Sequence, residues 1–130
     1  IKCHSFVGVS KQDIKSPTST QPVSMQWYKI FSDLAAARSR LKDSRPQRVQ
    51  IGHVTICLVM MEENFFAVQD ACTHSRASLS NGWVNQLGEI ICPWHNYRFE
   101  LKSGTPCDSS CASLRTYPVK WNESGFYIGV

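Results

Sequence analysis

Two short motifs in the second half of the chain each combine a thiol with an imidazole. Cys72-Thr73-His74 and Cys92-Pro93-Trp94-His95 place one Cys and one His two or three residues apart. Thiolates and neutral imidazoles are among the side chains that bind zinc and iron in proteins. A tight loop after a strand allows both side chains of a motif to face one metal centre. Cys72, His74, Cys92 and His95 are therefore candidate metal ligands.

Two kinds of metal centre use two thiolates and two imidazoles. One is a tetrahedral zinc site. The other is a [2Fe–2S] cluster in which two His replace two Cys on one of the irons. Zinc fingers usually keep their two Cys in one half of the motif and their two His in the other, whereas here each motif contributes one of each. This interleaved order favours the cluster.

The paired motifs and their flanks resemble those of Rieske-type [2Fe–2S] proteins. The family pattern is C-x-H followed by C-x-x-H, and the stretch HNYRFELKSG after the second motif is similar to that of Rieske ferredoxins. The final LRTYPVKWNESGFYIGV is similar to their closing hairpin. The resemblance covers residues 25–130. It implies that Cys72 and Cys92 bind one iron and that His74 and His95 bind the other, near the surface where a partner can approach.

The chain departs from the respiratory and photosynthetic members of that family at three positions. Ala77 and Trp94 stand where those proteins carry two cysteines joined as a disulfide, and Tyr97 stands where they carry a serine that donates to a bridging sulfur. Hydrogen bonds to the sulfurs stabilise the reduced form, so a lost donor lowers the potential. We expect a reduction potential nearer to about −150 mV than to about +300 mV.

The pattern of the remaining chain predicts short strands and one helix. Ser32 or Asp33 is a suitable N-cap for a short helix over residues 34–41. Apolar and aromatic stretches predict strands at residues 26–31, 48–51, 54–61, 65–69, 89–92, 98–101, 116–120 and 126–130. Many short strands with one short helix predict an all-β sandwich or small barrel. The resemblance implies a base of antiparallel sheets with an inserted cluster-binding subdomain at about residues 71–97.

The 130 residues are enough for one domain. Residues 16–24, SPTSTQPVS, have one apolar residue and two prolines, a composition typical of linkers. We therefore expect residues 1–24 to form a disordered tail and residues 25–130 to form the folded Rieske domain.

Charge and hydropathy bear on partners and location. The net charge is +4, and residues 1–50 carry nine basic and three acidic side chains without a run of five basic ones. We therefore expect no nucleic-acid partner. The longest nearly apolar run, residues 54–61, is far shorter than the roughly 20 residues that span a bilayer. Because residues 1–24 also lack the pattern of a signal peptide, we expect no membrane contact and a cytoplasmic location.

Three cysteines outside the motifs receive separate predictions. Cys57 lies within an apolar strand and is expected to be a buried structural thiol. Cys107 and Cys111 lie in a polar loop with three residues between them, and we expect free thiols there, with a conditional disulfide as the alternative.

The resemblance implies a ferredoxin-like one-electron carrier that takes electrons from a reductase and passes them to an oxygenase or another oxidoreductase. A small Rieske subunit of a larger oxidoreductase, such as a nitrite reductase, is the alternative, and a zinc-binding or redox-sensing module is a third possibility. Oxygenase subunits also need a mononuclear iron site, and only His4 and His53 remain to supply it. We therefore expect an electron-transfer component and not a stand-alone catalyst.

Overall fold

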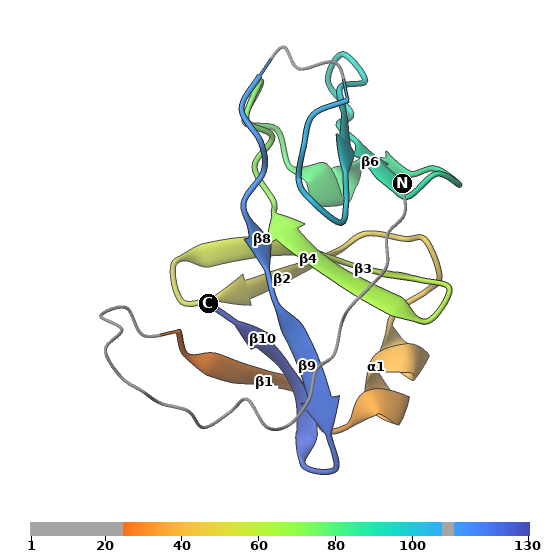
Figure 1. The fold of residues 1–130 in the computed structure, drawn as a ribbon, viewed down its shortest axis with the longest axis vertical. Coiled ribbons are helices and arrows are strands. Elements are labelled where there is room, and N and C mark those ends of the chain that lie inside the picture. Colours follow the sequence, from red (N-terminus) through yellow and green to blue (C-terminus); the bar gives the residue numbers. More distant parts are fainter. Residues whose placement is uncertain (1–24, 108–110) are drawn as a thin grey trace.

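The structure, a computed structural model, describes residues 25–107 and 111–130. They form three antiparallel sheets and one short α-helix, and the smallest sheet lies above the other two (Figure 1). The predicted all-β class with one helix is confirmed. None of the described helices is long and apolar enough to cross a membrane. The predicted tail, residues 1–24, lies outside the described residues.

The first sheet of the base joins both ends of the described chain. Its order is β1 (Trp27–Phe31), β10 (Gly125–Gly129) and β9 (Val119–Asn122). Asn122 is paired with Gly125, so the predicted closing hairpin is confirmed. Phe126 on β10 is fully buried, and its ring contacts those of Phe31 at 5.5 Å and Phe65 at 4.9 Å between centroids.

The second sheet of the base contains β2 (Gln47–Ile51), β3 (Val54–Met61), β4 (Asn64–Gln69) and β8 (Thr116–Tyr117), in that order. Strands β2, β3 and β4 agree with the predicted ones to within one residue. The single strand predicted at residues 116–120 is wrong, because two strands, β8 and β9, share this segment. Pro118 separates β8 from β9 and has no N–H to donate to a ladder, and the chain passes from the second sheet to the first at this residue.

The helix α1 (Leu34–Arg40) connects the two sheets of the base. Of the two predicted caps, Asp33 is the N-cap, and its carboxylate accepts a hydrogen bond of 2.8 Å from the amide of Ala36. The helix ends one residue before the predicted end, because Leu41 has extended backbone angles. Ala37 and Leu41 are buried and anchor the helix on the core of the base.

The third sheet forms the upper part of the molecule, which we define as residues 71–107. It contains β5 (Trp83–Val84), β6 (Glu89–Ile91) and β7 (Arg98–Glu100), preceded by a 3-10 helix at Leu79–Asn81. The predictions missed β5 and the 3-10 helix, because segments of two and three residues are too short for a periodic pattern. The predicted cluster-binding subdomain, residues 71–97, lies within this upper part.

Strand β3 contributes to two hydrophobic cores, because alternate side chains of a strand point to opposite faces of the sheet. Ile56 and Leu58 face the core of the base, together with Phe126. Cys57 and Val59 face the core beneath the upper part, together with Phe99 and other buried apolar residues. The four-stranded sheet therefore supports the upper part on one face and is packed against the base on the other.

Candidate metal centre

The first motif lies in a tight loop after β4. An isolated bridge between Ala71 and Ser78 closes the loop, and the Cys72 amide donates to the Ala77 carbonyl at 2.9 Å. The Arg76 amide donates back to the Cys72 carbonyl at 2.7 Å, and Arg76 has a positive φ of 69°. These contacts turn the chain so that Cys72 points inward while His74 remains exposed.

The second motif lies in the turn between β6 and β7. The Cys92 amide donates to the Tyr97 carbonyl at 2.8 Å, and His95 and Asn96 both have positive φ, 67° and 57°. Two successive left-handed residues reverse the chain within the motif, at a cost of roughly 1–2 kcal/mol for each residue that is not glycine. Gly82 lies so close to the Ile91 carbonyl that a Cβ there would collide with it, so the segment before β5 packs directly against this loop.

The two loops bring the four predicted ligands together. Cys72 and Cys92 are fully buried in the core beneath the loops, and their thiols interact with each other. His74 and His95 are exposed, and their ring centroids lie 5.6 Å apart. The site thus has a dry side made of sulfur and an open side made of imidazole.

Hydrogen-bond donors point at both sulfurs. The His74 amide donates to Cys72 Sγ, and the Trp94 amide donates to Cys92 Sγ, each at 3.4 Å. The Ser75 hydroxyl lies 3.5 Å from Cys92 Sγ. Such donors stabilise negative charge on sulfur. Sequence reasoning missed Ser75, because its approach to a cysteine of the other motif depends on how the two loops meet.

The two thiols differ in their proton affinity. Burial acts to raise the pKa of Cys72, but hydrogen bonds from Ser75 and from the His74 amide outweigh it and lower that pKa below its ordinary value. Burial raises the pKa of Cys92, and the neighbouring Cys72 adds to this effect. The pair therefore releases its first proton more readily than its second, as expected for two interacting acids.

Aromatic side chains surround the two histidines. The Tyr97 ring is stacked on the His74 ring, with centroids 3.8 Å apart and an interplanar angle of 10°. Spacing along the chain gave no signal for this contact, which joins the two loops. Trp94 is perpendicular to His95 at 5.9 Å. Trp83 and Trp94 are 48% and 59% exposed.

The donor set fits a two-iron cluster better than a single ion. Within residues 25–107 and 111–130, no three His, Cys, Asp or Glu side chains form a group that could hold one metal ion. A [2Fe–2S] cluster with mixed ligands needs only two protein ligands on each iron. One pair of thiols and one pair of imidazoles meet that need.

The remaining described cysteines are free thiols, as predicted. Cys57 is buried, and burial raises its pKa above the ordinary range. Cys107 lies with its Sγ 3.3 Å from the Glu89 carboxylate. Partial burial and this carboxylate raise the pKa of Cys107 to about 11. Glu89 also pairs with Arg98 at 3.0 Å.

Comparison with known families identifies the class of this chain. A family model described as the Rieske [2Fe-2S] domain matches residues 27–118, which is more than half of the chain. The chain therefore belongs to the Rieske [2Fe-2S] domain family. Members of this family carry a [2Fe–2S] cluster, so the predicted family and cofactor are confirmed.

Individual relatives are similar over most of their own length. The ferredoxin subunit of 3-phenylpropionate/cinnamic acid dioxygenase from Photorhabdus laumondii subsp. laumondii is 37% identical over 76 residues, 58% of this chain and 72% of that protein. A chain in the complex of reduced oxygenase and oxidized ferredoxin in carbazole 1,9a-dioxygenase matches with a TM-score of 0.66 and 28% identity, over 78% of this chain and 99% of that one.

A third similarity concerns the fold alone. A structure described as an NADH-dependent nitrite reductase small subunit from Mycobacterium tuberculosis matches with a TM-score of 0.70. The match covers 83% of this chain and 97% of that one, at 19% identity. The same architecture therefore occurs in ferredoxins and in a reductase subunit.

Proposed function

We propose that this protein is a ferredoxin-like one-electron carrier in which Cys72 and Cys92 bind one iron of a [2Fe–2S] cluster and His74 and His95 bind the other. The observation that carries the proposal is the division of the site into two buried thiols and two exposed imidazoles. When bound, such a cluster accepts and releases one electron at a time.

The side chains of this chain divide the remaining work. The core beneath the loops keeps water from the two thiols, and the amides of His74 and Trp94 stabilise charge on them. The exposed imidazoles form the surface at which a redox partner can approach. The Tyr97 ring restricts the orientation of His74 through stacking.

The proposed partners are a reductase as donor and an oxygenase or another oxidoreductase as acceptor. Support comes from the relatives, which are ferredoxin components of dioxygenase systems, and from a similar ferredoxin found in complex with an oxygenase. The alternative, a small subunit of a nitrite reductase, is supported by similarity of fold. The free thiols of Cys57, Cys107 and Cys111 suit a reducing compartment and support a cytoplasmic location.

The test is the absorption spectrum and the reduced-state EPR spectrum of anaerobically purified protein, with iron and zinc counted on the same sample. We expect a red-brown protein with two irons per chain. Cys92→Ser and His95→Ala should each lose the colour, whereas the matched control Cys107→Ser should keep it, because Cys107 lies outside both motifs. A colourless protein with one zinc, or full colour in both ligand variants, would contradict the proposal.

A further inference from the structure

An open groove of about 570 Å³ begins beside the first loop of the candidate centre. Its lining residues come from the β2–β3 turn, from the end of β8 and from the segment that follows β4. Arg48, His53, Arg76 and Tyr117 are among the residues that line it. Ala71, Arg76 and Ser78, which also line the groove, belong to the loop that carries Cys72 and His74.

The groove is rich in unpaired positive charge. Arg48 and Arg76 are exposed, and Arg115 extends the same surface with its guanidinium 5.5 Å above the Tyr117 ring. In the part of the chain that the structure describes, the two side-chain ion pairs are Arg38–Glu63 and Arg98–Glu89. Neither of the two groove arginines belongs to either pair, and nor does Arg115 beside the groove.

One acidic group, Asp70, also lines the groove. It is only 4% exposed. One of its carboxylate oxygens accepts from the Ser78 hydroxyl, and the other accepts from the Ser80 amide at 2.9 Å. The exposed charged side chains of the groove are therefore basic, and the buried Asp70 carboxylate offsets one of the two arginine charges of the lining.

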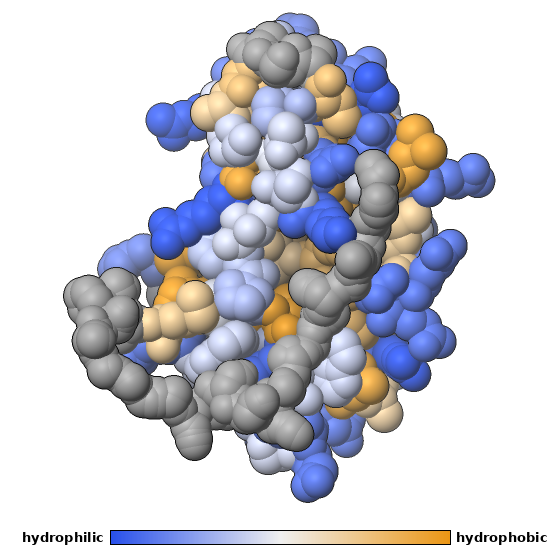
Figure 2. Space-filling model, viewed as in Figure 1, coloured by the Kyte–Doolittle hydropathy of each residue, from blue (hydrophilic) through white to orange (hydrophobic). Residues whose placement is uncertain are grey.

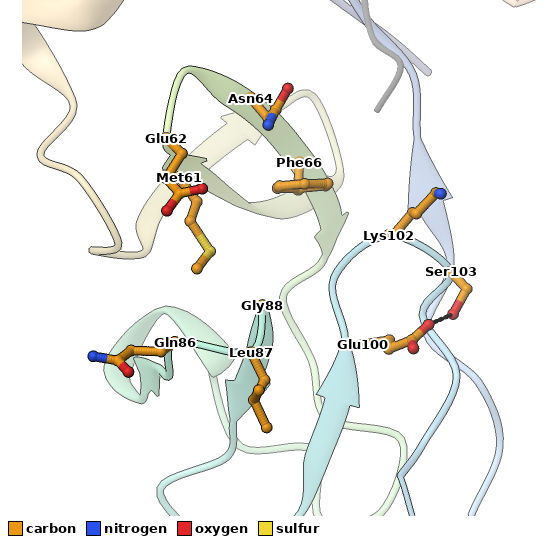
Figure 3. Close-up of a pocket in the computed structure, with 10 residues that line it drawn as sticks. All are labelled: Met61, Glu62, Asn64, Phe66, Gln86, Leu87, Gly88, Glu100, Lys102 and Ser103. Atoms are coloured by element: carbon orange, nitrogen blue, oxygen red, sulfur yellow. Dashed lines mark hydrogen bonds between the residues drawn. The ribbon is translucent and has the colours of Figure 1, made fainter. Parts of the chain in front are cut away.

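The opposite end of β3 has a different character. A pocket of about 540 Å³ lies there between the β3–β4 turn and the β5–β6 turn, and the Met61 side chain points toward the β5–β6 turn (Figure 3). Met61, Phe66 and Leu87 contribute apolar surface, and Glu62 and Glu100 contribute negative charge beside Lys102. Basic and acidic surfaces thus lie at opposite ends of one strand.

We propose that the groove beside His74 docks an acidic segment of the protein that exchanges electrons with this one; the inference rests on the proposed function. Exposed charges attract oppositely charged partners and raise association rates at low salt. On the face of the molecule shown in Figure 2, hydrophobic residues are interspersed with hydrophilic ones.

In the binding test, a synthetic peptide of ten glutamates is added to the protein at low salt. Binding is measured by the changes in the backbone amide chemical shifts of the protein. We expect shifts confined to Arg48, His53, Arg76 and their neighbours. Arg48→Glu combined with Arg76→Glu should weaken binding at least about tenfold, and 300 mM NaCl should do the same. The matched control, Lys42→Glu with Arg45→Glu, makes the same change in net charge at exposed positions in the loop between α1 and β2. Equal weakening by the control would overturn the proposal.

A second test measures oxidation of the reduced protein by hexacyanoferrate(III), an anionic one-electron oxidant that becomes hexacyanoferrate(II). The groove variant should react several-fold more slowly than the control variant at low salt, and the two rates should converge at high salt. Equal rates at low salt would overturn the docking surface while leaving the carrier function intact. A colourless protein would instead overturn the carrier function and, with it, the redox partner.

Discussion

The base and the upper part of this molecule are stabilised in different ways. In the base, aromatic rings from distant strands meet in one core, with Phe126 in contact with Phe31, Phe65 and Trp121. In the upper part, short strands and loops depend on backbone hydrogen bonds, on left-handed residues such as His95 and Asn96, and on contacts made by Asp70.

The two parts therefore serve different purposes: the base provides stability, and the upper part positions the candidate ligands. Hydrophobic burial is roughly proportional to area and tolerates small changes of geometry, whereas metal ligands must be placed accurately by directional contacts. The long strands of the base therefore provide a stable support. The four candidate ligands lie in tight loops next to short strands, where single contacts determine the orientation of each side chain.

The largest expected effect comes from breaking the base. Phe126→Ala removes a fully buried ring from between two sheets and should lower the free energy of unfolding by about 3–5 kcal/mol, measured by chemical denaturation. Tyr28→Ala, at an exposed position of β1, is the control and should change it by less than about 0.5 kcal/mol. A loss below about 1 kcal/mol in Phe126→Ala would show that the aromatic core is not the main support.

A smaller effect is expected from breaking the connection between the two parts. Asp70→Ala leaves the Ser78 hydroxyl and the Ser80 amide without their acceptor, which should cost about 1–3 kcal/mol. Hydrogen exchange should rise at residues 78–82 more than in β3 and β10. Asp70→Asn retains one carbonyl acceptor and should have an intermediate effect. Uniform acceleration over the whole chain would indicate instead that the two parts unfold together.

A local effect is expected at the stacked pair of the candidate centre. Tyr97→Ala removes the ring above His74, and stacking of this kind is worth about 0.5–1.5 kcal/mol. The cluster should therefore be lost about two- to tenfold faster in the presence of a chelator, followed by the decay of visible absorbance. Tyr97→Phe keeps the ring and should behave like the wild type. A Phe variant as labile as the Ala variant would assign the effect to the hydroxyl.

The smallest effect should be a gain, in the β3–β4 turn. Glu62 and Glu63 both have positive φ, 53° and 71°, which suits glycine or asparagine. Glu63→Gly relieves that strain and gives up only an exposed ion pair with Arg38, so the free energy of unfolding should rise by about 0.5–1 kcal/mol. The matched change Glu123→Gly, in the β9–β10 turn where φ is not positive, should give no gain. A loss of stability in Glu63→Gly would mean that the ion pair outweighs the strain.

The sequence by itself determined the features that depend on local pattern. The apolar strand β3, the cap at Asp33 and the closing hairpin were all predicted, because each depends on neighbours within a few residues. The two Cys–His motifs likewise identified the candidate ligands and the family. The types of residue and their spacing were sufficient for these conclusions, because the chemistry of thiolate and imidazole does not depend on the fold.

Only the tertiary structure decided how separate segments meet. The break at Pro118, the short strand β5, the stacking of Tyr97 on His74 and the approach of Ser75 to Cys92 all involve residues whose partners lie in other loops or sheets. The charge of the groove also required the fold, since Arg48, Arg76 and Arg115 are far apart in the chain. The physical reason is that packing and electrostatics act through space, between residues that no spacing in the sequence connects.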